Sequence, residues 1–299
     1  MKTPYHPGEL AVQERAGVRA GAAKIGAGID DTIPPAAAHF LAQRYTLYVG
    51  STDLEGRPWA SELFGPPGFV TVSEPHTVRI DAVPAPGDPL GANLRPDAHV
   101  GLLAIDLVTR RRYRVNGRAT VDAAGAIRVA VDQAYGNCPK YIQRREPVGV
   151  RDDGFDPARL VRTTALSPDQ QRRLAAADTF FLATTHPSGA DVSHRGGAPG
   201  FVHVVDDRTL AWPDYAGNTM LMSLGNLEAD PRAGILVVDF ETGDRLQLTG
   251  RARIEWSAAR AAELAGAERV VELRVDAVVD APGASPIRWR LLEPSPFNP

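Results

Sequence analysis

The sequence predicts a mainly β protein with flanking helices (β/α+β), in which two small antiparallel β-barrels follow one another in the chain. Two related stretches, at residues 33–121 and 166–254, carry the same pattern at a spacing of 132 to 133 residues. Apolar residues alternate with polar ones along several segments, as in strands with one buried face. The 28 Gly and 25 Pro are typical of many tight turns between short strands.

The repeat extends over much of the chain and keeps its order. The matching segments are Pro67–Val70 with Pro199–Val202, Asn93–Leu94 with Asn226–Leu227, Gly101–Asp106 with Gly234–Asp239, and Gly117–Ala119 with Gly250–Ala252. A period this long indicates a duplicated domain rather than a solenoid. Two like domains usually pack about a pseudo-twofold axis, so we expect the halves to form a pseudo-dimer.

Each half begins with the same local elements. A helix with prolines at its start, Ile33–Leu41, precedes a strand at Thr46–Ser51. In the second half a helix with Ser167 as its N-cap precedes a strand at Thr179–Thr184. The order of helix, strand, turn and strand is therefore predicted to be the same in both halves.

Later segments complete the prediction for each half. Arg112–Val121 and Asp244–Ile254 alternate as strands, and Val271–Asp280 is predicted to be a closing strand. Ile127–Tyr135, in contrast, has a helical pattern. Six or so short strands in each half favour a small closed antiparallel barrel.

Composition divides the chain into four regions. Residues 1–32 are a polar N-terminal arm rich in Gly and Ala, with a short helix near Glu9–Ala16. Residues 33–150 hold the first barrel and an additional segment, Asn137–Arg144. Residues 151–165 are predicted to be a linker, and residues 166–299 hold the second barrel.

Charge, apolar runs and cysteine content exclude several functions. The net charge of −3 offers no basic excess for nucleic acid, and the longest apolar runs, such as Ala233–Val238, are too short to span a membrane. No apolar leader is visible at the N-terminus, so we expect a cytoplasmic protein. The single cysteine, Cys138, cannot form an internal disulfide or a thiolate metal site, and the histidines lack metal-ligand spacing.

The two halves differ most in two segments, which therefore are candidates for a functional site. Ser193–Gly197 contains Arg195, which has no basic counterpart in Ser61–Gly65. Pro213–Asn226 is rich in hydroxyl and amide groups, whereas its counterpart around residues 81–89 is rich in proline. Glycine backbone N–H groups and an arginine fork are suited to phosphate, so the second half is predicted to hold a phosphate site.

Four motifs together resemble the pyridoxamine 5′-phosphate oxidase-like family of FMN-binding split barrels, and in particular its two-barrel members. The motifs are His6–Gln13, Tyr135–Arg144, Ser193–Phe201 and the stretch from Asn226 to Ala252. The resemblance implies two tandem six-stranded antiparallel split β-barrels, with FMN at the interface between them. Because only the second half carries the cationic segment, we expect one FMN site in each chain.

The resemblance also implies roles for individual residues. Arg195 would clamp the phosphate, Asn218 and Thr219 would add donors, and the backbone from Trp212 to Asp214 would follow the ribityl chain. The other half would cover the site through Asn137–Arg144. The candidate FMN-binding residues are therefore Ser193, His194, Arg195, Gly196, Trp212, Pro213, Asp214, Asn218, Thr219, Arg245, Gln247, Lys140, Gln143 and Arg144.

Three functions remain open at this point. The first is an FMN-dependent oxidoreductase that takes hydride or electrons from NAD(P)H or from a partner protein. The second is a non-catalytic flavin- or haem-binding or sensing protein, and the third is a binding protein without a cofactor. The C-terminal arginine- and histidine-bearing motif that binds pyridoxal phosphate in the true oxidase is not found, so the substrate stays open. Both a monomeric pseudo-dimer and a homodimer agree with the sequence.

Overall fold

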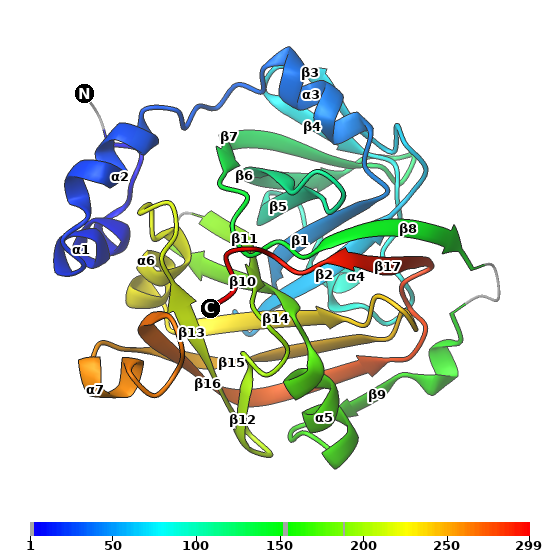
Figure 1. The fold of residues 1–299 in the computed structure, drawn as a ribbon. Coiled ribbons are helices and arrows are strands. Elements are labelled where there is room, and N and C mark those ends of the chain that lie inside the picture. Colours follow the sequence, from blue (N-terminus) through cyan, green and yellow to red (C-terminus); the bar gives the residue numbers. More distant parts are fainter. Residues whose placement is uncertain (1–2, 152–154, 188) are drawn as a thin grey trace.

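The computed structural model describes residues 3–151, 155–187 and 189–299. Within them the chain forms two large antiparallel sheets with flanking helices, and the sheets pack against each other (Figure 1). The prediction of a mainly β protein that is built from two like halves is therefore confirmed.

The first sheet has the strand order β2-β1-β5-β6-β7-β4-β3. Its strands are β1 (Thr46–Thr52), β2 (Pro58–Phe64), β3 (Val70–Glu74), β4 (Thr77–Ile80), β5 (Ala98–Asp106), β6 (Arg111–Val121) and β7 (Ile127–Asn137). Helix α3 (Pro35–Ala42) precedes this sheet, and the short helix α4 (Pro89–Asn93) leads from β4 into β5.

The second sheet has the order β11-β10-β14-β15-β16-β13-β12, and β9 (Val161–Thr163) pairs with β16. Its other strands are β10 (Thr179–His186), β11 (Gly189–Gly196), β12 (His203–Asp206), β13 (Thr209–Tyr215), β14 (Arg232–Val238), β15 (Arg245–Glu255) and β16 (Ala267–Ala281). The helices of this half are α5 (Pro168–Ala176), α6 (Met222–Ala229) and α7 (Ala258–Ala261).

Strand for strand, the two sheets have the same order, with β10 to β16 in the places of β1 to β7. Seven strands follow one another in the order of each sheet, whereas six or so were predicted for each half. The prediction of a helix at Ile127–Tyr135 was wrong, because this segment lies within β7. Ile127, Val129 and Val131 are buried while the residues between them are exposed, and this period of two belongs to a strand.

The first sheet curls around its own apolar core. Leu63 of β2 and Val70 of β3 lie at opposite ends of the strand path, yet both belong to one buried cluster. The second half has a separate core, in which Trp212 and Phe180 are fully buried. Each half therefore buries its own apolar residues.

A third apolar cluster lies between the two sheets and marks their pseudo-twofold axis. Tyr48 and Phe181, which hold equivalent places in β1 and β10, stack with ring centroids 3.4 Å apart. Leu103 and Leu236, also equivalent, belong to the same cluster. Stacking of equivalent residues is expected only near a symmetry axis, so the halves pack as the predicted pseudo-dimer.

Two equivalent glycines allow the halves to approach closely. A Cβ at Gly101 would lie 2.6 Å from the Asp191 Cα, and a Cβ at Gly234 would lie 2.8 Å from the Trp59 Cα. Any larger residue would push the two backbones apart, because neither contact is with a flexible side chain.

The N-terminal arm packs on the second half through helices α1 (Pro7–Arg15) and α2 (Arg19–Gly26). His6 and Glu9 form a capping box at the start of α1, which confirms the short helix expected near Glu9–Ala16. Gln13 donates a hydrogen bond of 2.8 Å to the Met220 backbone oxygen. As a result α1 lies against α6 (Figure 1).

The remaining elements join the two halves. Strand β8 (Arg144–Val150) pairs with β17 (Ile287–Glu293) in a separate two-stranded sheet. Strand β16 contains the predicted Val271–Asp280 strand, but β17 follows it. The predicted linker contains the 3-10 turn Pro157–Arg159 and β9. None of the helices in the described residues is both long and apolar enough to cross a membrane.

Candidate functional site

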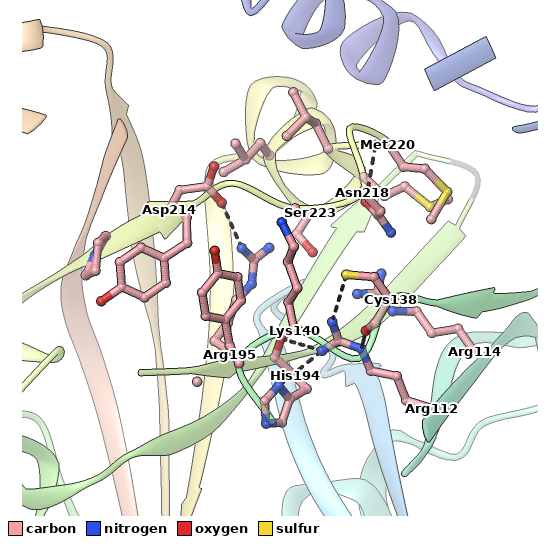
Figure 2. A pocket seen from close by; sticks show the side chains of 18 of the residues that line it. Arg112, Arg114, Cys138, Lys140, His194, Arg195, Asp214, Asn218, Met220 and Ser223 are labelled. Atoms are coloured by element: carbon pink, nitrogen blue, oxygen red, sulfur yellow. Dashed lines mark hydrogen bonds and ion pairs between the residues drawn. The ribbon is translucent and has the colours of Figure 1, made fainter. Parts of the chain in front are cut away.

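A small pocket opens where the two halves meet. It lies between the ends of β6 and β7 from the first half and β11, β13 and α6 from the second (Figure 2). The enclosed space is about 100 Å³. Its lining is Arg112, Arg114, Cys138, Lys140, Tyr141, His194, Arg195, Gly196, Phe201, Pro213, Asp214, Tyr215, Gly217, Asn218, Met220, Leu221, Met222, Ser223 and Leu224.

Four cationic side chains line this pocket, against one carboxylate, Asp214. Two of the four have acidic partners. Arg114 pairs with the buried Asp191 of the other half at 3.0 Å. Arg195 pairs with Asp214 at 2.9 Å (Figure 2). Asp214 also pairs with Arg269 at 2.7 Å, so a single carboxylate faces two guanidinium groups there. The pocket therefore has an excess of positive charge.

Arg112 is one of two cations of the pocket, with Lys140, for which no acidic partner is found among the described residues. Its Nε donates to the Cys138 backbone oxygen at 2.9 Å, and its Nη1 donates to Nδ1 of His194 at 3.1 Å (Figure 2). In the described ranges no carboxylate pairs with it. Burial lowers the pKa of Arg112 to about 10, so it is still charged at neutral pH. A charge held among protein atoms without a counterion is costly, which favours an anionic ligand.

His194 is held in its neutral form beside this guanidinium. Burial, and then the charge of Arg112, keep the pKa of His194 well below its usual value. A neutral imidazole can accept the Arg112 hydrogen bond through Nδ1. His194 therefore orients Arg112 without removing its charge.

Helix α6 begins at the pocket with no side-chain cap. Its N-cap residue, Leu221, has a φ of 53° and makes no side-chain hydrogen bond to the helix. The first residues of α6, including Ser223, line the pocket. Unpaired N–H groups at a helix N-terminus attract anions, and they add to the positive charge of the arginines.

The pseudo-twofold axis relates the cationic pocket to a second region, and there the chain's own side chains fill the space. Arg245 and Gln247 of β15 occupy the positions that Arg112 and Arg114 occupy in β6. Arg245 donates to the Glu62 backbone oxygen at 3.1 Å, as Arg112 donates to that of His194. Asp88, the N-cap of α4, lies 3.6 Å from Arg245 and 3.4 Å from Gln247. A carboxylate of the chain thus occupies the space that stays open in the cationic pocket.

The structure brings half of the candidate residues into the pocket. Those in its lining are His194, Arg195, Gly196, Pro213, Asp214, Asn218 and Lys140. Ser193 lies directly behind, where its Oγ accepts a hydrogen bond of 3.0 Å from Ser223. Asn218 accepts a bond from the Met220 backbone N–H and thereby shapes the loop before α6 (Figure 2).

The other candidates lie outside the pocket, each for a structural reason. Trp212 is fully buried in the second core, 5.3 Å from the Phe180 ring. Gln143 is buried and donates to the Gly197 backbone oxygen at 3.0 Å, while Arg144 pairs with Glu293 at 3.4 Å. Thr219 packs near Gly21 of the arm. Arg245 and Gln247 belong to the filled equivalent place described above.

Sequence reasoning did not single out Arg112, Arg114, Ser223 or Tyr141, although it considered Tyr215 as a ring that packs on the flavin. Tyr141 donates from its hydroxyl to the Ala216 backbone oxygen at 3.0 Å, and its ring lies 4.9 Å from that of Tyr215. This contact joins the two halves across the opening. The internal repeat held a signal for Arg112, because it aligns with Arg245, a residue that was selected.

The chain belongs to the pyridoxamine 5′-phosphate oxidase family. The family model described as "Pyridoxamine 5'-phosphate oxidase" matches twice, over residues 33–152 and 166–289. Two matches in one chain agree with the duplicated fold, and they make this a two-domain member. A comparison with curated proteins found no match.

Solved structures with partial similarity include three of interest. HupZ from Group A Streptococcus is 15% identical, covers 38% of this chain and 98% of its own, and has a TM-score of 0.32. A candidate pyridoxamine 5′-phosphate oxidase from Lactobacillus delbrueckii is 19% identical, with coverages of 39% and 94% and a TM-score of 0.32. A protein named F420 reductase is 18% identical, with coverages of 38% and 98% and a TM-score of 0.29.

Proposed function

We propose that the cationic pocket binds FMN, one molecule per chain, and that the protein is an FMN-dependent oxidoreductase. The observation that carries the proposal is Arg112, a charged guanidinium in the pocket wall with no carboxylate partner in the described ranges. Membership of the pyridoxamine 5′-phosphate oxidase family supports a flavin or a related nucleotide as the anionic ligand.

Both halves contribute to the proposed phosphate site. The first half supplies Arg112 and Lys140, and the second supplies Arg195 and the uncapped start of α6. Charge-assisted hydrogen bonds of this kind are about twice as strong as neutral ones. The place equivalent to this site is filled by Asp88, and this supports one FMN per chain rather than two.

The enclosed space of about 100 Å³ suits the phosphate end of the ligand, whereas a ligand of flavin size needs roughly 300 Å³ or more. Binding of the whole cofactor therefore requires side chains at the mouth to move. Tyr141, which reaches across to Ala216, is the side chain placed to do so. We expect the Tyr141 side chain to move away from Ala216 as FMN enters, and then to lie over the bound flavin ring.

FMN, when bound, supplies the hydride or electron transfer, and the protein supplies binding, orientation and electrostatics. Arg112 and Arg195 would hold the anion, and the neutral His194 would keep Arg112 in place. Tyr141 and Tyr215 would limit the access of water to the pocket. The donor that we propose is NAD(P)H or a redox partner protein.

The binding proposal is tested by titrating FMN into the flavin-free protein and following the quenching of flavin fluorescence. Arg112→Ala should weaken FMN binding by roughly 10- to 100-fold, the value of one charge-assisted hydrogen bond. Arg118→Ala, an exposed arginine outside the pocket, is the matched control and should leave the affinity unchanged. Equal losses in the two variants, or no uptake of FMN by the wild type, would refute the proposed site.

A second measurement separates an enzyme from a carrier. The FMN-loaded protein is mixed with NADH or NADPH under anaerobic conditions, and the absorbance of oxidised flavin is followed. Rapid loss of the absorbance of oxidised flavin after NADH or NADPH is added supports an oxidoreductase that uses a nicotinamide donor. A flavin that neither nicotinamide nor a reduced ferredoxin-type protein can bleach would point instead to a binding or sensing protein.

A further inference from the structure

A second, larger cavity lies behind the cationic pocket, under helix α1 of the N-terminal arm. It measures about 560 Å³, and residues of the arm, of β5, β6 and β7 in the first half and of β10, β11 and α6 in the second form its walls. Met222 lines both cavities. The Arg114–Asp191 ion pair stands between them, with Arg114 in the wall of the pocket and Asp191 in the wall of the cavity.

The charge of this cavity is opposite to that of the pocket. Four carboxyl groups belong to its lining, against the single cation Arg118. The negative charge of Asp191 is neutralised by its ion pair with Arg114 on the side of the cationic pocket. Arg118 lies 3.5 Å from Asp97 and 3.8 Å from Asp132 at an exposed edge. The buried Glu9 has the imidazole of His6 beside it, with Nε2 3.7 Å from its Oε2, and burial lowers the pKa of His6.

A buried acceptor atom in the cavity wall has no partner in the described parts of the chain. Asn116 is only 7% exposed, and its Oδ1 receives no hydrogen bond, although its Nδ2 donates to Gln133 at 3.3 Å. A buried acceptor without a donor costs about 1–3 kcal/mol, so Asn116 Oδ1 indicates a ligand that donates a hydrogen bond.

Glu9 adds a carboxyl group to the same wall. It is 2% exposed, and its Oε2 accepts a hydrogen bond of 2.8 Å from the His6 backbone N–H. Burial raises the pKa of Glu9 to about 8, and the nearby charge of Asp191 contributes. A cation placed beside it would restore the ionised form. The other titratable groups that face this region are Tyr5, His6, His99, Tyr135, His186 and Asp191.

The equivalent cavity of the other half has a different balance of charge, because the two carboxyl groups in its lining, Asp53 and Glu55, both pair with Arg57. It measures about 500 Å³, and Trp59 stands there in the place of Asp191. Thr249 and Ala277 replace Asn116 and Gln133 at the equivalent pair of positions. Strand β9, rather than α1, contributes to its wall. The two equivalent cavities therefore differ in their polar side chains, although they share one scaffold.

We propose that the cavity under α1 binds a small organic molecule that carries a protonated amine. An ammonium group has three donors and no acceptor, so it matches Asn116 Oδ1 and the Glu9 carboxyl. An anionic ligand is disfavoured by the surrounding carboxyl groups, whereas the neighbouring pocket selects anions. The inference goes beyond FMN binding, because it concerns a different cavity and ligands of the opposite charge.

The test uses isothermal titration calorimetry on the full chain without flavin, at about pH 8, with benzylamine, benzyl alcohol and benzoate as probes. We expect benzylamine to bind at least tenfold more tightly than benzyl alcohol, and benzoate not to bind. Glu9→Gln and, separately, Asn116→Leu should each weaken benzylamine binding by roughly tenfold or more. Glutamine keeps the capping box of α1, so Glu9→Gln should stay folded.

Glu14→Gln is the matched control, because Glu14 is an exposed residue of the same helix. It should bind benzylamine as the wild type does. Equal affinities for benzylamine and benzyl alcohol, wild-type binding in Glu9→Gln, or no heat with benzylamine at millimolar concentration would each overturn the inference. FMN affinity measured in the same Glu9→Gln protein should be unchanged. Failure of the amine-binding proposal can therefore be told apart from failure of the FMN proposal.

Discussion

Replacement of Glu9 by glutamine should stabilise the protein, and the gain should depend on pH. Glu9 is 2% exposed and lies at the third position of α1. Burial is the largest influence on its pKa and raises it, the hydrogen bond from the His6 N–H lowers it, and the charge of Asp191 raises it. The net result moves the pKa from 4.5 to about 8.

The sign of the effect follows from proton binding. Between pH 4.5 and about 8 the folded protein keeps the proton on Glu9, whereas the unfolded chain has released it. The free energy of unfolding therefore falls as the pH rises through this window, by up to about 1.4 kcal/mol for each pH unit. Over the whole window the loss amounts to about 5 kcal/mol at most, and above pH 8 it no longer grows.

Glutamine cannot ionise and can still cap α1, so Glu9→Gln should lack this loss. Its advantage over the wild type should be near zero at about pH 4.5 and largest at about pH 8. Urea unfolding at a series of pH values measures it. Other groups titrate in the same range, such as His186 with a pKa lowered to about 4 by burial, but their effects cancel in the difference.

Glu14→Gln controls for the same replacement at an exposed position of the same helix. A difference between Glu9→Gln and wild type that is independent of pH would show that Glu9 is ionised normally in the folded protein. A glutamine variant less stable than wild type at about pH 8 would refute the reasoning altogether.

Three further predictions concern the contacts between the halves. Asp191→Asn should lower the free energy of unfolding by about 3–5 kcal/mol, because it leaves the buried Arg114 without a counterion, and Arg114→Met in the same chain should restore much of the loss in urea unfolding. Phe181→Ala should cost about 3–5 kcal/mol by removing the ring stacked on Tyr48, and an unchanged urea midpoint would contradict this packing. Tyr141→Phe removes the hydrogen bond to Ala216 and should speed FMN association in stopped-flow fluorescence without changing stability by more than about 0.5 kcal/mol.

Local pattern was sufficient for much of the fold. The repeat at 132 to 133 residues, the alternation in Arg112–Val121 and the cap at Ser167 predicted two like halves and several of their elements. These features succeed because periodicity and caps act between residues that are close in sequence. The helix predicted at Ile127–Tyr135 failed because the segment has the period of two of a strand, with Ile127, Val129 and Val131 buried, and β7 pairs with β4 and β6.

Local sequence pattern does not predict which side chains line the site. Arg112 and Arg245 occupy equivalent positions in the repeat, yet one faces an open pocket and the other faces Asp88. Trp212, by contrast, belongs to the apolar core.

The sequence by itself determined the duplication, the strand faces and the asymmetry between the two copies, because each is written in neighbouring or repeated residues. Only the tertiary structure decided which β6 side chains meet β11 and α6 across the pseudo-twofold axis. It also placed α1 over a cavity whose walls come from both halves. Those contacts join residues about 80 to 220 positions apart, and their geometry depends on how two sheets pack rather than on any local preference.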